Sequence, residues 1–103
     1  MIFQPHRFSR TQAFYKEFAR TLDLADRAII LEVYAASEKP IVGVTSKMIT
    51  DAMDHGEYIP NFVEVTDSVV EMAQPQDVII TLGAGDVSSL APIIVEGLSR
   101  RFG

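Results

Sequence analysis

One continuous apolar run constrains the fold of this 103-residue chain more than any other feature of its sequence. Residues 28–31 are all apolar and lack the alternation that marks a strand with one face in solvent. An unbroken run of this length suits a strand that is covered on both faces, and such strands occur mainly in parallel sheets. Residues 78–82 are the most strand-like segment of the chain and extend the same prediction to its second half.

Helical and loop segments surround these strands. Ile2-Phe3 is a short apolar strand, and a helix is predicted to begin at Ser9, whose hydroxyl and the Gln12 side chain fit a capping box. The inner face of this helix repeats at helical spacing in Tyr15, Phe18, Ala19 and Leu22. A long connection at residues 35–44 then leaves the carboxyl end of the second strand, where α/β folds bind ligands.

The second half of the chain continues the alternation of strands and helices. The elements predicted there are a short helix capped by Thr45 or Ser46 and ended by His55-Gly56, a strand at residues 62–65 and a helix at residues 66–73. Pro92 is tolerated only in the first turn of a helix, so the last helix is predicted to begin near Ser89. This order predicts a three-layer α/β domain with a mainly parallel sheet. The short first strand suggests that the amino end of the domain is cut.

The net charge of −5 is unevenly distributed along the chain. Residues 1–47 hold seven Lys and Arg against five Asp and Glu, whereas residues 48–99 hold nine Asp and Glu and no Lys or Arg. An acidic chain argues against nucleic acid as a partner, because a phosphate backbone requires a broad basic surface. There is no cysteine, no signal peptide and no apolar run of the ~20 residues that a membrane helix needs. A cytoplasmic protein without membrane contact is expected.

Three groups that can carry positive charge lie at the start of the first predicted helix: His6, Arg7 and Arg10. The N–H groups and the dipole of a helix N-terminus already favour an anion, and the guanidinium fork matches a carboxylate or a phosphate. Solvated surface arginines are the alternative explanation. From the residues alone, an anion site is predicted here, but not a complete active site.

The other sequence motifs give weaker evidence of function than the cluster at His6, Arg7 and Arg10. Residues 83–88 imitate a dinucleotide-binding fingerprint, but Ser88 replaces its third glycine and no further strand–helix–strand unit follows. The two histidines indicate neither a metal site nor a catalytic triad, and Asp23 and Asp26 are interpreted as solvating charges at a helix end. A dinucleotide-binding module, and a non-enzymatic interaction domain that docks through the acidic residues 48–99, remain alternatives.

Three segments together resemble the C-terminal domain of the Mur ligases. Residues 3–11 resemble the family's signature, residues 31–43 are similar to its second marker, and residues 82–86 to its third. The motifs occur in the right order and leave only residues 55–61 without a counterpart. The resemblance implies that residues 1–103 are a Rossmann-like, amino-acid-binding domain that is truncated at its N-terminus and lacks its first strand and helix. The chain is then a fragment of a three-domain protein.

The resemblance also implies an activity. It points to the branch of the family that joins L-alanine to UDP-N-acetylmuramate in peptidoglycan synthesis. In such ligases ATP phosphorylates the muramoyl carboxylate, and the amine of L-alanine then displaces phosphate from the acyl phosphate. The other two domains of the same ligase bind the UDP-sugar and ATP with Mg²⁺. The chain alone is therefore expected to bind neither ATP nor Mg²⁺ and to be inactive.

Site residues follow from the same resemblance. The residues expected to face the carboxylate of the amino acid or of the muramoyl group are His6, Arg7 and Arg10. The residues expected to line that pocket through backbone groups are Gly83, Ala84 and Gly85. The residues expected near the ATP-facing edge are Tyr34 and Glu38. No residue is predicted to be catalytic, and none to bind a metal.

Overall fold

The computed structural model describes all 103 residues and contains a four-stranded sheet and four α-helices. Its elements are β1 (Ile2–Phe3), α1 (Phe8–Leu22), β2 (Ala28–Ile30), α2 (Lys47–Asp51), β3 (Gly56–Tyr58), α3 (Phe62–Met72), β4 (Thr81–Leu82), the short 3₁₀ helix η1 (Asp86–Ser89) and α4 (Leu90–Phe102). The strands lie in the order β3-β2-β1-β4, and each neighbouring pair is parallel. The predicted α/β architecture with a mainly parallel sheet is confirmed.

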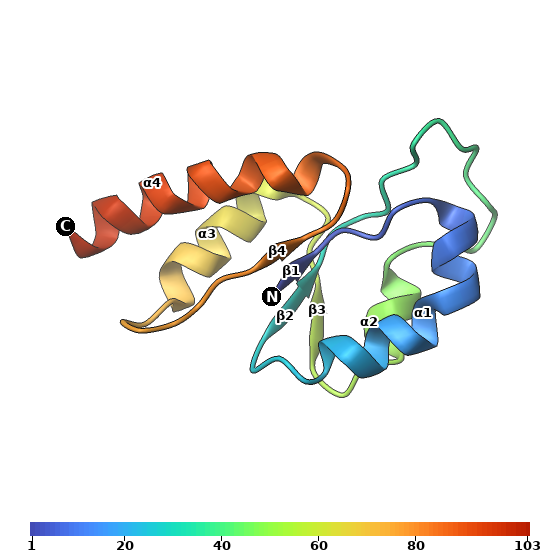
Figure 1. Cartoon of the computed structure of the whole chain (residues 1–103), viewed down its shortest axis with the longest axis horizontal. Coiled ribbons are helices and arrows are strands. Elements are labelled where there is room, and N and C mark those ends of the chain that lie inside the picture. The colour runs from blue at the N-terminus through green and yellow to red at the C-terminus, as the bar shows by residue number, and fades with distance from the viewer.

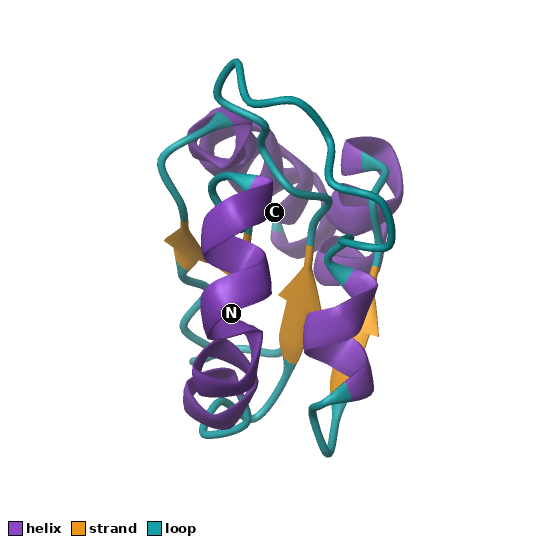
Figure 2. Ribbon diagram, turned by 90° about the vertical axis from the view of Figure 1, so that its right-hand side faces the viewer, coloured by secondary structure: helices purple, strands orange, loops and turns teal.

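Helices cover both faces of the sheet and produce three layers (Figure 1). Helices α1 and α2 pack on one face, which Figure 2 shows from the front, and α3 and α4 pack on the other. The side chains of the second strand alternate between these layers: Ile29 and Leu31 join the core beneath α3 and α4, whereas Ala28 and Ile30 join the core beneath α1 and α2. Because both faces are covered, residues 28–31 need no polar position.

The predicted inner face of α1 is confirmed in its main features. Ala19 and Leu22 are buried in the core that α1 shares with α2, and Tyr15 and Phe18 pack at its margin. The Phe18 ring lies 5.3 Å from that of Phe3, measured between centroids. The helix is thereby fixed against the sheet beside β1.

The predicted strand at residues 62–65 is wrong, because these residues form the first turn of α3. The Asn61 side chain accepts hydrogen bonds from the backbone N–H groups of Val63 and Glu64, at 2.8 and 3.2 Å, and so caps the helix. Val65 and Val69 then point into the core four residues apart. β-Branched residues favour strands in isolation, but here the cap and the helical spacing of the buried valines prevail.

The strand that the sequence did not predict is β3, which lies within residues 55–61, the segment that none of the three motifs covers. Gly56–Tyr58 pairs with Ala28–Ile30, and as an edge strand with half-exposed residues it carries no apolar run. At the opposite edge, β4 comprises only the last two residues of the predicted strand 78–82, although the Ile80 carbonyl still accepts a hydrogen bond from the Ile2 N–H at 2.8 Å. The predicted start of the last helix near Ser89 is confirmed.

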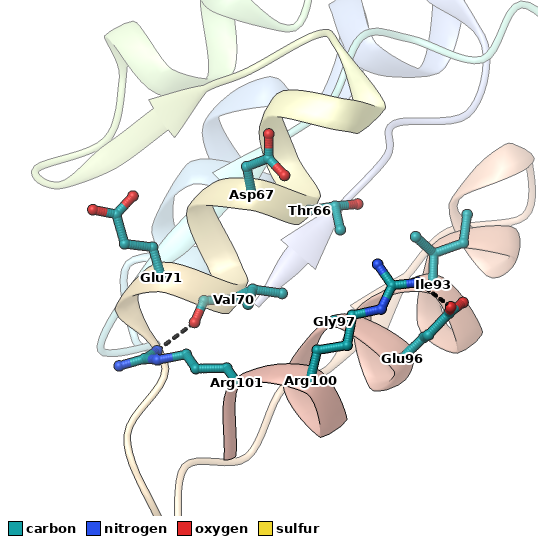
Figure 3. A pocket seen from close by; sticks show the side chains of 9 residues that line it. All are labelled: Thr66, Asp67, Val70, Glu71, Ile93, Glu96, Gly97, Arg100 and Arg101. Atoms are coloured by element: carbon teal, nitrogen blue, oxygen red, sulfur yellow. Dashed lines mark hydrogen bonds and ion pairs between the residues drawn. The ribbon is translucent and has the colours of Figure 1, made fainter. Parts of the chain in front are cut away.

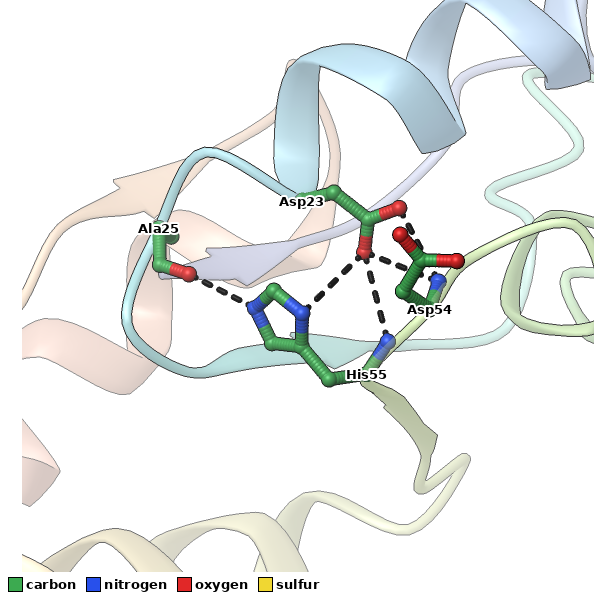
Figure 4. Close-up of polar contacts among 4 residues, drawn as sticks. All are labelled: Asp23, Ala25, Asp54 and His55. Carbon is green, nitrogen blue, oxygen red and sulfur yellow. Dashed lines mark hydrogen bonds and ion pairs between the residues drawn. The ribbon is translucent and has the colours of Figure 1, made fainter.

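Asp23 is more than a solvating charge at the end of α1, contrary to the prediction. Its carboxylate accepts hydrogen bonds from the backbone N–H groups of Asp54 and His55, and lies 3.4 Å from Nδ1 of the His55 ring (Figure 4). The Nε2 atom of that ring lies 2.7 Å from the carbonyl oxygen of Ala25. These contacts hold the turn before β3 against the end of α1. His55 is exposed, but it holds this turn.

Replacing Asn61 by alanine is expected to destabilise the domain by about 1 kcal/mol, because two N–H groups at the start of α3 lose their acceptor. Urea unfolding followed by circular dichroism measures the change. Asn61→Asp keeps an acceptor at the same position and is the matched control, expected to stay close to the wild type. An equal loss in both variants contradicts the capping role.

Candidate functional site

The strand order marks one end of the sheet as a ligand-binding edge. From β1 the chain steps outward to β2 and β3, and then returns across the sheet to β4 on the other side of β1. This is the strand order of the first part of a Rossmann fold, in which the direction of the connections reverses between β1 and β4. Ligands of open parallel sheets bind beyond the carboxyl ends of the strands at such a reversal. Residues 4–7 and 83–86 leave the sheet there.

Gln4 joins the carboxyl ends of β1 and β4. Its N–H donates to the Leu82 carbonyl, and its buried side-chain Oε1 accepts a hydrogen bond from the Val87 N–H, each at 2.9 Å. Gly83, with φ of +146°, lies directly against it, and a Cβ there would come within 2.9 Å of the Gln4 carbonyl oxygen. The sequence analysis did not single out Gln4, whose only signal is an amide side chain directly after an apolar strand.

Tyr34 brings together two of the other predicted site residues, His6 and Gly85. The Tyr34 N–H donates to the Pro5 carbonyl, and the Arg7 N–H donates to the Tyr34 carbonyl, both at 2.8 Å. The Tyr34 ring stacks on the His6 ring with 5.9 Å between centroids and 17° between planes. Gly85 lies so close to the Tyr34 ring that a Cβ at this position would overlap it. His6, Tyr34 and Gly85 thus share one surface at the carboxyl edge.

The start of α1 is capped from the 35–44 connection, and not by the predicted capping box. The helix begins at Phe8, and the N–H and hydroxyl of Ser9 donate to the two carboxylate oxygens of Glu38, at 2.8 and 2.6 Å. The hydrogen bonds from Ser9, with a smaller contribution from the charge of Arg7, lower the pKa of Glu38. A carboxylate of the chain itself therefore occupies the N–H group of Ser9 that was expected to be open to a ligand anion.

Arg7 and Arg10 extend from the start of α1 into solvent. Arg7 is the residue that precedes the helix and has a φ of +71°, a left-handed conformation that is uncommon outside glycine. Arg10 follows three positions later, in the first turn of the helix. Both side chains are exposed, and neither guanidinium group takes part in an ion pair or hydrogen bond of the chain. Ala84, also exposed, lies at the tip of the turn between Gly83 and Gly85.

A second group of polar residues lies at the carboxyl ends of β2 and β3, and the sequence did not predict it. Glu32 accepts hydrogen bonds from the backbone N–H groups of Val33 and Ser46 and from the Tyr58 hydroxyl. Burial and the neighbouring carboxylate raise the pKa of Tyr58 to about 12. The Ser46 hydroxyl is buried beside this group and has no hydrogen-bond partner. These contacts tie the start of α2 to the sheet.

The groove between α3 and α4, of about 480 Å³, is a weaker candidate (Figure 3). Its two arginines are already engaged: Arg100 pairs with Glu96, and Arg101 donates to the carbonyls of Val70 and Ala73 at the end of α3. A larger, mostly apolar cleft of about 540 Å³ lies at the amino ends of the strands, away from the ligand-binding edge. No group of three or more His, Asp or Glu side chains is placed to hold a metal ion, and no helix is long and apolar enough to cross a bilayer.

The fold and this edge define a parallel α/β domain of the kind that holds a ligand where the strand order reverses. The family model described as "Mur ligase, glutamate ligase domain" matches residues 1–85, and the chain belongs to the Mur ligase family, as its motifs predicted. It is 50% identical over 98 residues to the UDP-N-acetylmuramate–L-alanine ligase of Paenarthrobacter aurescens. The proteins of the same name from Thermobifida fusca and Mycolicibacterium paratuberculosis are 46% identical over 100 residues and 45% over 101 residues. These alignments cover 95–97% of the chain, which spans only about a fifth of each relative's length.

Gly85→Ala is expected to destabilise the domain by about 1–3 kcal/mol, because the added methyl group overlaps the Tyr34 ring. Urea unfolding of the single variants and of the double variant with Tyr34→Ala measures the coupling between the two positions. Once the ring is removed the methyl group has space, so most of the loss caused by Gly85→Ala should disappear in the double variant. Additive losses contradict the proposed contact.

The cap on α1 makes part of the stability depend on pH. Because the pKa of Glu38 is lowered on folding, its stabilising contribution is present above the ordinary pKa of a glutamate and is lost as the pH falls through the lowered, folded value. In Ser9→Ala the pKa of Glu38 is expected to rise towards its ordinary value, which an NMR titration of the carboxyl carbon measures. Ser37→Ala, in the same connection, is the control. An unchanged Glu38 titration in Ser9→Ala contradicts the cap.

Proposed function

We propose that this chain is the substrate-binding C-terminal domain of an ATP-dependent ligase that joins L-alanine to UDP-N-acetylmuramate during peptidoglycan precursor synthesis. One observation carries the proposal. The side chains of His6, Arg7 and Arg10 lie beside the carboxyl edge at which the strand order reverses, in a chain whose relatives bear that ligase's name. Both substrates of such a ligase offer a carboxylate to this cluster.

In this proposal the two guanidinium groups recognise the carboxylate, because Glu38 already engages the Ser9 N–H at the start of the helix. A guanidinium presents a rigid fork that binds a carboxylate in a defined orientation. The His6 ring, stacked on Tyr34, contributes a further polar group in a fixed plane. Gly83, Ala84 and Gly85 complete the pocket through backbone groups.

In this proposal, different domains of the ligase carry out different parts of the reaction. ATP transfers its γ-phosphoryl group to the muramoyl carboxylate with release of ADP, and the amine of L-alanine then attacks the acyl carbon and releases phosphate. ATP and Mg²⁺ are bound mainly by the central domain of the ligase. Residues 1–103 orient the reactants. This orientation accelerates the reaction most once the domains close and exclude water. At the edge facing ATP, the Tyr34 ring lies beside the His6 ring, and Glu38 holds the 35–44 connection to α1.

The surroundings of the glycines argue against a dinucleotide-binding module. In a dinucleotide fingerprint, the absence of side chains lets the backbone approach a pyrophosphate. Here the space beside Gly83 is filled by Gln4 and Val87, and that beside Gly85 by the Tyr34 ring. Both glycines are therefore explained by packing within the chain.

The test transfers this chain into an active ligase. Residues 1–103 replace the matched region of the Paenarthrobacter aurescens relative, and phosphate release is measured with ATP, L-alanine and UDP-N-acetylmuramate. We expect turnover by the chimera and none above background by the 103-residue chain alone. A folded but inactive chimera, or turnover by the chain alone, contradicts the proposal.

In the same chimera, Arg7→Ala and Arg10→Ala are each expected to raise the KM for L-alanine or for UDP-N-acetylmuramate on the order of tenfold or more. The reason is the loss of a charge-assisted hydrogen bond of about 1.5–3 kcal/mol. Arg20→Ala removes an exposed arginine from the last turn of α1 and is the matched control, expected to leave both KM values unchanged. Unchanged KM values in Arg7→Ala remove Arg7 from the site.

A further inference from the structure

The side-chain amide of Gln4 has a partner for its oxygen and none for its nitrogen. Gln4 follows β1 at the carboxyl edge and is only 5% exposed. A backbone N–H can only donate, so the amide atom that lies 2.9 Å from the Val87 nitrogen must be the oxygen. The amide nitrogen Nε2, with its two N–H groups, therefore points away from Val87.

Neither of these N–H groups donates a hydrogen bond to an atom of the chain. A polar group that is mostly buried costs free energy when it lacks a partner, and most such groups bind another group or water. The Gln4 nitrogen is not sealed in the core, because the one fully enclosed side-chain polar atom without a partner is the Ser46 hydroxyl. It therefore reaches the surface through the small exposed part of Gln4, and a bound molecule can accept from it.

This donor lies where parallel α/β sheets bind ligands. Gln4 is the first residue after β1, and its backbone N–H bonds to the Leu82 carbonyl at the end of β4. It thus spans the two strands between which the strand order reverses. Gly83, which packs against the Gln4 backbone, has no side chain that could cover the amide. Arg7 follows three residues later, so one short segment brings a neutral donor and a cation to this edge.

We propose that the Nε2 group of Gln4 is a substrate contact and donates a hydrogen bond to the carboxylate of a bound reactant. This inference rests on the proposed function, in which both L-alanine and UDP-N-acetylmuramate offer a carboxylate to this edge. A carboxylate only accepts hydrogen bonds, and an amide nitrogen only donates them, so the two groups are complementary. Gln4 then holds the turn after β4 through its oxygen and the reactant through its nitrogen.

Two substitutions separate the two ends of the amide. Gln4→Glu keeps an acceptor for the Val87 N–H but removes both donors, whereas Gln4→Met removes the acceptor and the donors together. In the chimera, both variants are expected to raise the KM for L-alanine or for UDP-N-acetylmuramate on the order of tenfold, and the KM that rises identifies the carboxylate. Urea unfolding is expected to show the larger loss of stability in Gln4→Met, because only there does the Val87 N–H lose its acceptor.

Gln74→Glu is the matched control for this pair. Gln74 is exposed and lies at the amino ends of the strands, away from the ligand-binding edge, so the same change there should leave both KM values unaltered. Unaltered KM values in Gln4→Glu, beside raised values in Gln4→Met, show that Gln4 acts only through its oxygen and overturn the proposal.

Nuclear magnetic resonance of the unsubstituted chimera, isotope-labelled at glutamine, provides a readout that does not depend on how the variants fold. The side-chain N–H signals of Gln4 are expected to shift when L-alanine and UDP-N-acetylmuramate are added, whereas those of Gln74 stay in place. Gln4 signals that stay in place with both substrates overturn the proposal. An active chimera that fails these tests refutes this contact alone, whereas a folded but inactive chimera refutes the proposed function.

Discussion

The buried amide of Gln4 is the contact on which the geometry of the ligand-binding edge depends. Its side chain accepts the N–H of Val87, 83 positions away in the sequence, while its backbone bonds to the end of β4. A buried amide left without a partner costs about 1–3 kcal/mol, so this joint strongly favours one arrangement. Because Gly83 packs against the same backbone, the turn after β4 and the segment that leads from β1 to His6 move as one unit.

The contact between Glu38 and Ser9 changes how an anion can be held beside this joint. A free helix N-terminus offers its N–H groups and the positive end of its dipole. In this domain a carboxylate of the chain engages the first turn of α1 and offsets part of that positive potential. What remains for a ligand is the charge of Arg7 and Arg10, carried on flexible side chains. Under the proposed function, recognition of the carboxylate therefore depends on the guanidinium groups more than on the backbone.

The sequence predicted those parts of the structure that depend on local pattern. The unbroken run 28–31 indicated a strand between two layers of helices because each of its side chains enters one of two cores. The strand β3 was not predicted because an edge strand needs no apolar run. Residues 62–65 were assigned to a strand because their valines favour strands, whereas the Asn61 cap starts a helix there. Contacts between distant segments, such as Glu38 with Ser9, leave no periodic signal in either segment.

The exposure of the Arg7 and Arg10 guanidinium groups limits the strength of an ion pair that they form on the isolated domain. A pair of opposite charges in open solvent contributes roughly 0–1 kcal/mol, because water screens the attraction and the side chains lose freedom. The same contact is much stronger where water is excluded, since the effective dielectric constant falls. Arg7 and Arg10 lie on the surface of this domain, so a carboxylate bound by them gains full strength only when another domain covers the cluster. Under the proposed function, these two side chains therefore account both for weak binding by the isolated domain and for productive binding in a closed ligase.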